Sequence, residues 1–217
     1  MNSSNKKENI NFFKSELKKT ELLLEINRKI AGLKNLSEIL WTIIDFVTEN
    51  VGGDRGSLFL NDSETNELYS RVAQGELTRE IRILNTVGIA GAIFTSQKGE
   101  IIHDVYSDKR FNKEVDQETG YKTRNMICSP VKTVRGQIIG VIQVLNKKKG
   151  RFTKDNLNFV DAIATQAAVS IQNAQNNEFF QKKRAQEMEF VSIVSDVTAE
   201  IDLSALLKRV MEEATRM

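Results

Sequence analysis

Residues 126–146 read MICSPVKTVRGQIIGVIQVLN, two apolar, β-rich segments separated by a polar turn. The segments cover residues 126–134 and 140–146, and Arg135-Gly136 between them is a dipeptide typical of tight turns. This pattern predicts a β-hairpin. Because the strands of a hairpin run antiparallel, the stretch favours an antiparallel sheet.

A second hairpin is predicted earlier in the chain. The apolar run SLFL at 57–60 and the run LYSRVA at 68–73 flank a polar turn at 61–66. Between the two hairpins the sequence predicts a short strand around residues 81–83, a helix over 88–97 and a short strand over 100–104. Residues 105–124 are polar and only weakly periodic.

Helices are predicted on both sides of the strands. Apolar residues at three- and four-residue spacing predict one helix over 12–30 and a second, capped by Ser37, that ends near Val51. The last third carries a narrow stripe of apolar and small residues: Leu157, Val160, Ala164, Ala167, Ile171 and Ala174. Such a seam is typical of a helix in a dimer, or of one packed on its own sheet, and both remain open. Helices on one face of an antiparallel sheet predict the α+β class.

The two ends of the chain resemble each other. Leu36-Ser37 recurs 167 residues later as Leu203-Ser204, and Ile26 falls on Ile193 at the same offset. Further pairs at this offset are Ile30 with Val197, Leu40 with Leu207, Ile43 with Val210 and Ile44 with Met211. The pattern predicts a polar tail and helix start (1–20), a domain (21–154), a connecting helix (155–188) and the opening helices of a second, truncated copy (189–217). A chance match between amphipathic helices is the alternative.

Composition excludes several classes of function. The 217 residues contain 31 Lys+Arg and 29 Asp+Glu, so a net charge of +2 gives no reason to expect a nucleic-acid or anionic-membrane partner. No apolar run reaches the roughly 20 residues of a spanning helix, and the polar first residues have no secretory core, so no membrane insertion is expected. One cysteine allows no disulfide framework, which favours a reducing compartment, the cytoplasm.

Catalytic signatures are missing from the sequence. It contains no P-loop, GxGxxG, HExxH or GxSxG motif. Cys128 and His103 are a conceivable nucleophile–base pair, but the apolar segment around Cys128 favours a core thiol. Asp104, Asp108 and Asp116 lack EF-hand spacing. The sequence therefore predicts no catalytic residue and no metal site.

Two segments are candidates for ligand binding. Gly88-Ile89-Ala90-Gly91 opens a predicted helix, whose first backbone N–H groups can hold an anion, although glycines also open ordinary helices. Residues 115–125 concentrate hydroxyl and amide groups that suit a heterocycle edge, although a solvated loop has a similar composition. Gln143 is an amide within an otherwise apolar strand.

Four motifs, in this order, resemble those of GAF domains: Arg55-x-Ser57-Leu58-Phe59-Leu60; Gly88-Ile89-Ala90-Gly91; Thr119-Gly120-Tyr121-x-Thr123-Arg124-Asn125-Met126-Ile127-Cys128-x-Pro130; and Gly140-Val141-Ile142-Gln143-Val144-Leu145-Asn146-Lys147. The resemblance is to the GAF domains of cyclic-nucleotide phosphodiesterases and bacterial adenylyl cyclases. It implies a sheet of about six antiparallel strands backed by helices, a ligand enclosed on the opposite side, and tandem domains joined by a long C-terminal connecting helix.

The resemblance also implies ligand contacts. Cyclic-nucleotide-binding members place the purine against the position of Ser57 and the cyclic phosphate against the backbone N–H groups of Ile89 and Ala90. The other implied contacts are Asn112 near the phosphate, Asp116, Thr119 and Thr123 on a lid-like segment, and Gln143 on the sheet. A helix start can hold the single phosphate charge without a lysine, and threonine hydroxyls both donate and accept.

The chain departs from the family pattern at several positions. Ala73-Gln74 stands where members that bind cyclic GMP often carry Phe-Asp, and Asn112 replaces an expected aromatic residue. The family's Asn-Lys, Phe and Asp-Glu motif is partly kept as Asn146-Lys147 and Phe152.

The end of this motif also differs. Asp155 follows Phe152 after two residues instead of three, and Asn156 stands in place of the Glu. The resemblance implies a structural ion pair between Lys147 and Asp155.

These observations favour a regulatory, small-molecule-sensing GAF domain of a signalling protein, with cyclic AMP or cyclic GMP as the leading ligand. Binding would be relayed through the helical linker, in a homodimer joined by a coiled coil of the connecting helices, to an output domain such as an adenylate cyclase or phosphodiesterase. The alternative is a GAF-fold module for dimerisation and signal relay without ligand binding.

Overall fold

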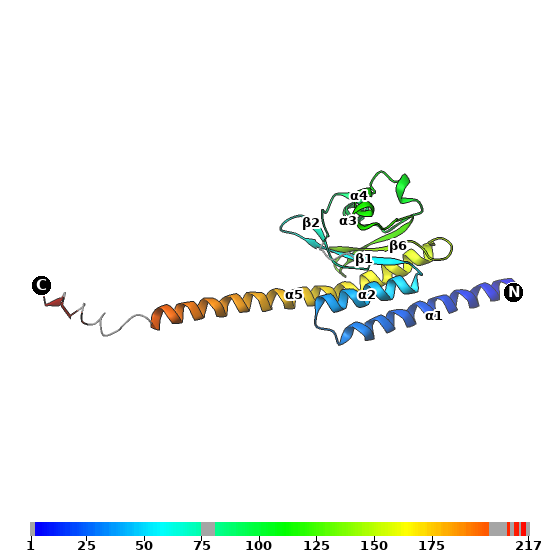
Figure 1. The fold of residues 1–217 in the computed structure, drawn as a ribbon. Coiled ribbons are helices and arrows are strands. Elements are labelled where there is room, and N and C mark those ends of the chain that lie inside the picture. The colour runs from blue at the N-terminus through cyan, green and yellow to red at the C-terminus, as the bar shows by residue number, and fades with distance from the viewer. Residues whose placement is uncertain (1–2, 75–80, 200–207, 209–210, 213, 216–217) are drawn as a thin grey trace. The chain divides into compact units, whose positions relative to one another are not determined.

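A computed structural model describes residues 3–74, 81–199, 208, 211–212 and 214–215 (Figure 1). The chain divides into two compact units, residues 1–174 and 175–217. The strands are β1 (Arg55–Asp62), β2 (Glu67–Ala73), β3 (Ile81–Leu84), β4 (Glu100–Ile102), β5 (Met126–Lys132) and β6 (Ile138–Leu145). The helices are α1 (Ser3–Ala31), α2 (Leu36–Asn50), α3 (Gly88–Ser96), the 3-10 helix η1 (Val105–Ser107), α4 (Lys113–Thr119) and α5 (Lys154–Ala199).

The six strands form one antiparallel sheet in the order β3-β2-β1-β6-β5-β4. Strands β5 and β6 are the hairpin predicted over residues 126–146, and β1 and β2 are the earlier hairpin. The two hairpins join through β1 and β6, which pair from Arg55 with Leu145 to Leu60 with Gly140. The predicted α+β class and six-stranded antiparallel sheet are therefore confirmed.

A β-bulge in β2 determines which of its side chains face which side of the sheet. Phe59 pairs with Ser70 and Leu58 pairs with Val72, so Arg71 is the extra residue. Because successive strand residues alternate between faces, this insertion places Val72 in the same hydrophobic core as Leu58.

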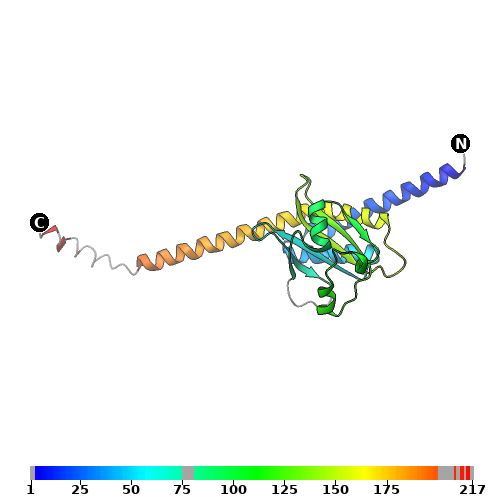
Figure 2. The ribbon, with the colours of Figure 1, turned by 90° about the horizontal axis from the view of Figure 1, so that it is seen from above.

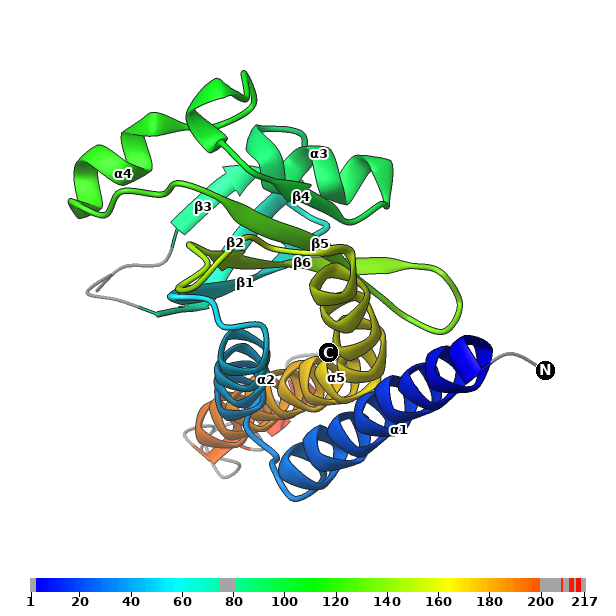
Figure 3. The same cartoon turned by 90° about the vertical axis from the view of Figure 1, so that its right-hand side faces the viewer.

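Helix α2 and the first part of α5 cover one face of the sheet, and α1 packs against α2 on the side away from the sheet (Figure 3). The core on this side contains Ile26 and Ile30 of α1 and Ile43 and Val47 of α2, all nearly inaccessible to solvent. Each fully buried aliphatic side chain of this size stabilises the fold by roughly 1.5–3 kcal/mol. The helix layer therefore supplies much of the stability of the first unit.

The small-residue stripe of α5 packs within this core. Ala164, Ala167 and Ala168 are each at most 1% exposed, as is Ile171. The sequence left open whether this stripe belongs to a dimer or packs on its own sheet. Over residues 160–174 the structure shows it packed in the domain's own core. Small side chains fit this densely packed interior, where a larger side chain would force its neighbours apart.

Two local predictions need correction. Asn35, not Ser37, caps α2: its Oδ1 accepts hydrogen bonds from the backbone N–H groups of Ser37 and Glu38. Residues 105–124, whose periodicity is weak, contain the short helices η1 and α4. Both are too short for the 3.6-residue period to be visible in the sequence.

The opposite face of the sheet carries α3, η1 and α4 (Figure 2). A second core lies here, in which Phe59 and Val141 of the sheet pack with Ile89 and Ile93 of α3 and Val105 of η1. Helices thus cover both faces. The candidate site lies on this second face.

The second unit contains the part of α5 from residue 175 onward. Its apolar side chains are largely exposed: Phe179, Phe180, Met188, Phe190, Val191, Ile193, Val194 and Met211. Ile193 is 54% exposed, whereas Ile26, with which it is matched in the predicted repeat, is 1% exposed. Val197, Leu203, Ser204, Leu207 and Val210 of the predicted repeat lie outside the residues whose side chains are described. Over the described residues, no helix combines the length and apolar character that a membrane crossing requires.

Candidate functional site

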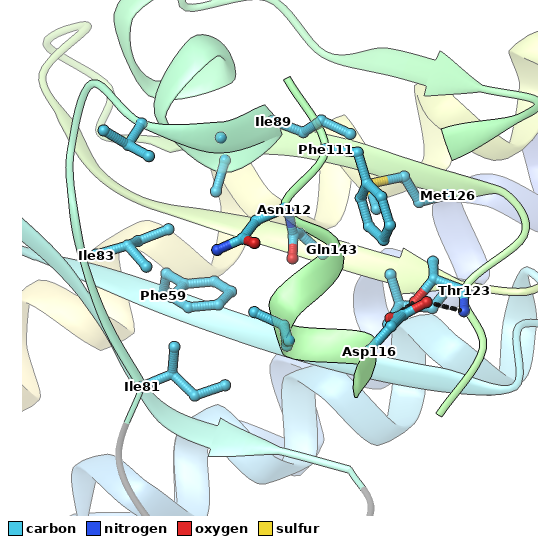
Figure 4. Close-up of a pocket in the computed structure, with 15 residues that line it drawn as sticks. Phe59, Ile81, Ile83, Ile89, Phe111, Asn112, Asp116, Thr123, Met126 and Gln143 are labelled. Carbon is cyan, nitrogen blue, oxygen red and sulfur yellow. Dashed lines mark hydrogen bonds between the residues drawn. The ribbon is translucent and has the colours of Figure 1, made fainter. Parts of the chain in front are cut away.

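A pocket lies between the sheet and helices α3 and α4 (Figure 4). It has a volume of about 120 Å³, and an adjoining lobe adds about 90 Å³. Together the two lobes are called the hollow below. They adjoin, because they share seven lining residues: Phe59, Ile81, Val115, Asp116, Thr123, Gln143 and Leu145. A single water needs only about 10–15 Å³ of such volume, so the hollow has room for a small molecule.

The floor of the pocket is polar where β1 and β6 meet. Ser57 pairs with Gln143 across the two strands and with Ala73 on β2. The Ser57 side chain is buried, and its hydroxyl makes no hydrogen bond within the described part of the chain. Gln143 donates from Nε2 to Cys128 Sγ at 3.6 Å, a weak bond that leaves its carbonyl oxygen available. Both side chains line the hollow with unused hydrogen-bonding capacity.

The walls are largely apolar. Phe59, Ile83, Phe111 and Met126 line the larger lobe, and their labelled side chains surround the same space in Figure 4. Sequence reasoning missed these residues. The strand period could have identified Phe59, because Ser57 and Phe59 are two residues apart and share a face of β1.

The start of α3 presents backbone donors to the pocket. The capping position, Val87, has no side-chain acceptor, and its carbonyl oxygen accepts from Gly91 N at 3.1 Å. The N–H groups of Gly88, Ile89 and Ala90 have no acceptor among the described residues, and all three residues line the larger lobe. The positive end of the helix dipole therefore faces the pocket, an arrangement that favours an anion.

Gly91 sets how closely this helix approaches the preceding loop. A Cβ atom there would lie 2.6 Å from the carbonyl carbon of Thr86 and 3.0 Å from its Cα. The first distance is shorter than real Cβ contacts, and the second is at the tight limit of the range in which they occur. Only glycine leaves room for the observed helix start.

Residues 112–123, called the flap below, cover the pocket. Asn112 caps α4 by accepting from Glu114 N at 2.9 Å, and Gly120 ends the helix with φ +65°. Asp116 accepts hydrogen bonds from Thr123 N and Thr123 Oγ1, each at 2.7 Å. Of the ligand contacts that the resemblance implies on this segment, Asn112, Asp116 and Thr123 line the pocket, and the side chain of Thr119 lies outside the described residues.

The outer lobe ends at a stacked pair. The Arg55 guanidinium lies 4.1 Å from the centre of the Tyr121 ring. The Tyr121 hydroxyl donates to Asp54 Oδ2 at 2.8 Å and accepts from Asn146 Nδ2 at 2.9 Å. Burial, followed by the hydrogen bond to Asp54, raises the pKa of Tyr121 to about 12. Neither Arg55 nor Tyr121 was predicted as a site residue.

Gln74 and Ala73 also line the outer lobe. Gln74 Oε1 accepts from Gly56 N at 2.8 Å, and its Nε2 donates to Asp45 Oδ1 of α2 at 2.5 Å. The amide that replaces the family's Asp is therefore engaged within the protein. Ala73 supplies no ring for stacking.

Lys147 does not form the expected ion pair with Asp155. Its Nζ donates to the carbonyl of Val51 and to Asn156 Oδ1 at 3.4 Å, while the Asp155 side chain is exposed. Successive residues of a helix point about 100° apart. Asp155 lies one residue earlier than the family pattern has its Asp, so its carboxylate points away from Lys147, and Asn156 contacts the lysine instead. The amide keeps the link between β6 and α5 without a charge.

The geometry of Cys128 does not suit nucleophilic chemistry. Its side chain is fully buried, and burial raises the pKa of the thiol to about 12. His103 is exposed. No cluster of three or more His, Cys, Asp or Glu side chains suited to a metal occurs among the described residues.

The sequence and the fold both match known proteins. A probable 3′,5′-cyclic phosphodiesterase of Caenorhabditis elegans is 30% identical over 186 residues, covering 80% of this chain and 25% of the relative. A dual 3′,5′-cyclic-AMP and -GMP phosphodiesterase of Takifugu rubripes is 29% identical over 219 residues, covering 94% of this chain and 24% of the relative. The chain thus spans about a quarter of the length of these relatives.

Among solved structures, the GAF domain of a phosphoenolpyruvate-protein phosphotransferase from Coxiella burnetii has a TM-score of 0.66 at 18% identity, covering 74% of this chain and 96% of that one. A free methionine-R-sulfoxide reductase from Neisseria meningitidis has a TM-score of 0.62 at 19% identity, covering 76% of this chain and 93% of that one. At these identities the likeness concerns the fold. The sequence profile of the GAF domain matches residues 35–171, and the chain belongs to the GAF domain family.

Proposed function

We propose that this GAF domain is a regulatory sensor whose pocket binds a cyclic nucleotide, cyclic AMP or cyclic GMP. The proposal rests on the three N–H groups at the start of α3 that have no acceptor among the described residues, because their residues line an apolar pocket. A cyclic phosphate carries a single negative charge, which a helix start accommodates without a lysine or arginine.

The remaining pocket groups suit the rest of such a ligand. Ser57 and Gln143 offer free donors and acceptors for a heterocycle edge. The apolar walls provide the burial that a small-molecule site needs. By name, the Takifugu rubripes relative acts on both cyclic AMP and cyclic GMP, and a relative from Drosophila virilis is a phosphodiesterase specific for cyclic GMP.

Signal relay is the second part of the proposal. Gln74 joins the outer lobe to α2 through Asp45, and Lys147 joins the end of β6 to α2 and α5. A ligand that binds one arrangement of the pocket better than another would shift these helices. The output activity would belong to a separate domain, and a cytoplasmic location agrees with the single buried cysteine.

The test is thermal unfolding and isothermal titration with cyclic AMP and cyclic GMP. At a ligand concentration of 100 Kd, stabilisation of about 2.7 kcal/mol is expected. For a chain of this size that corresponds to a rise in Tm of roughly 5–10 °C. Adenosine and guanosine, which lack the phosphate, are the controls. The sensor proposal fails if neither cyclic nucleotide raises the Tm at millimolar concentration.

The second candidate is a dimerisation and signal-relay module without a ligand. It is favoured by the missing stacking ring at Ala73 and by the exposed apolar side chains of the second unit, Phe180 and Phe190 among them. In both candidates we propose a homodimer through the connecting helices. Light scattering after gel filtration tests it: replacing Phe190 by Glu should lower the measured mass, whereas replacing Val134 by Glu at the exposed hairpin tip should not.

A further inference from the structure

We propose that Tyr106 and Asp116 form a latch that holds α4 over the pocket, so that Asp116 acts on a ligand by positioning the flap and not by contacting it. Tyr106 lies on η1, outside the flap, and does not line the pocket. Asp116 lies on α4 and was predicted as a ligand contact. The latch itself needs no ligand, whereas its effect on the rates of ligand binding and release rests on the proposed function.

The carboxylate of Asp116 is already occupied. Oδ2 accepts from the Tyr106 hydroxyl at 2.9 Å and from Thr123 N at 2.7 Å, and Oδ1 accepts from Thr123 Oγ1 at 2.7 Å. The residue is only 8% exposed. A carboxylate offers about four acceptor sites, so little capacity remains for a ligand unless the flap is rearranged.

The flap depends on such anchors because α4 is short. Its seven residues are far below the roughly 12–15 at which an isolated helix becomes even marginally stable. One anchor is the hydrogen bond that Asp116 accepts from the Tyr106 hydroxyl, and another is the Tyr121 hydroxyl, which donates to Asp54 and accepts from Asn146. The first attachment joins the middle of α4 to η1, and the second joins the C-terminal end of the flap to the residues that flank β1 and β6.

Tyr106 is itself held in place. Its ring lies 5.3 Å from the ring of Phe111, and Lys113 Nζ lies 5.5 Å from the ring centre. The hydrogen bond to Asp116, followed by burial, raises the pKa of Tyr106, so the hydroxyl remains a donor at neutral pH. The side chain is 40% exposed, so water can replace the bond when the flap opens. This combination suits a contact that breaks and re-forms.

The direct test is amide hydrogen exchange of the full chain without ligand. Tyr106→Phe keeps the ring and removes the hydroxyl, and loss of one charge-assisted bond should speed exchange in α4 by about three- to tenfold. Exchange in β5 and β6 should stay unchanged. Tyr69→Phe, on the other face of the sheet, is the matched control and should leave α4 unaffected. Unchanged α4 exchange in Tyr106→Phe overturns the latch.

A double-mutant cycle separates a latch from independent effects. If Tyr106 acts through Asp116, adding Tyr106→Phe to Asp116→Asn should speed α4 exchange much less than it does alone. Full additivity of the two changes contradicts the proposal. Because neither measurement involves a nucleotide, a failure to bind cyclic nucleotides would refute the proposed function and leave the latch standing.

Ligand kinetics then test positioning against contact. Tyr106→Phe should raise both the association and the dissociation rate of a bound cyclic nucleotide, and Asp116→Asn should do the same. If Asp116→Asn instead abolishes binding while Tyr106→Phe has the wild-type rates, Asp116 contacts the ligand and the proposal is wrong. The wild-type complex supplies the reference rates.

Discussion

Replacing Gly91 by Ala tests whether close packing at the start of α3 sets up the anion site. A Cβ atom at this position would lie 2.6 Å from the carbonyl carbon of Thr86. Moving that contact out to 3.4 Å, where ordinary van der Waals contact begins, requires a shift of about 0.8 Å. Thr86 contributes backbone atoms, which cannot swing away as a flexible side chain would.

Two effects of this substitution oppose each other. Overpacking costs about 1–3 kcal/mol. Alanine in place of glycine within a helix increases the free energy of unfolding by about 1 kcal/mol. We therefore expect a net loss of up to about 2 kcal/mol in the free energy of unfolding, and for a chain of this size the full loss of about 2 kcal/mol lowers Tm by roughly 4–8 °C.

The effect on binding should be larger than the effect on stability suggests. A displacement of about 0.8 Å would lengthen an ordinary hydrogen bond beyond the range in which it counts as one. Losing one bond to a charged phosphate costs about 1.5–3 kcal/mol, so affinity for a cyclic nucleotide should fall at least about tenfold.

The control is Gly32→Ala, because a Cβ atom at Gly32 meets nothing within 4 Å. Differential scanning fluorimetry and titration calorimetry on both variants make the comparison. If Gly91→Ala matches Gly32→Ala in stability and in affinity, the packing argument for the helix start is refuted.

Other substitutions test the floor of the pocket, the contacts of Lys147 and the outer lobe. Ser57→Ala and Gln143→Leu should each weaken nucleotide binding in calorimetry by about tenfold while shifting Tm little, because neither side chain carries a strong internal hydrogen bond; a Tm loss without an affinity loss would contradict this. Lys147→Met should lower the free energy of unfolding in urea by about 1–2 kcal/mol, since the carbonyl of Val51 loses its donor, whereas Asp155→Asn should leave it nearly unchanged. Equal losses in the two variants would support an ion pair between Lys147 and Asp155. The folded pKa of Tyr121, about 12, is above its ordinary value of 10.0, so its contribution to stability is complete below pH 10 and lost as the pH rises through about 12. Tyr121→Phe should remove that part of the alkaline decline, and an unchanged pH profile would show that the tyrosine is not responsible.

Much of the pocket lining could be predicted from the sequence. The pattern at 57–60 and 140–146 predicts strands, and the family resemblance then brings Ser57, Gln143, Ile89 and Ala90 to one place. The structure arranges all four around the same hollow. Strand alternation and helix starts are local rules, so residues that follow them can be placed without coordinates.

The hydrogen-bond partners of the polar side chains could not be predicted from the sequence. Asp116 looks like a ligand contact in the sequence, yet it bonds to Thr123 and Tyr106. In the sequence, Gln74 stands where the family often has an Asp that could accept from a ligand. In the structure, its amide links Gly56 of β1 to Asp45 of α2. Hydrogen bonds between residues distant in the chain depend on distances of tenths of an ångström, which no spacing rule supplies.

The amino-acid order by itself determined an antiparallel sheet, its helical cover and the glycine-rich start of α3, because each follows from periodicity and from residue conformational preference over a few neighbours. The tertiary structure alone decided that the α5 stripe packs on its own sheet over residues 160–174, that Asn156 replaces Asp155 at Lys147, and that apolar side chains from several strands and helices enclose a pocket. The physical reason is range. Local preferences act over one or two turns of chain, whereas enclosure and hydrogen-bond pairing depend on where separate elements meet.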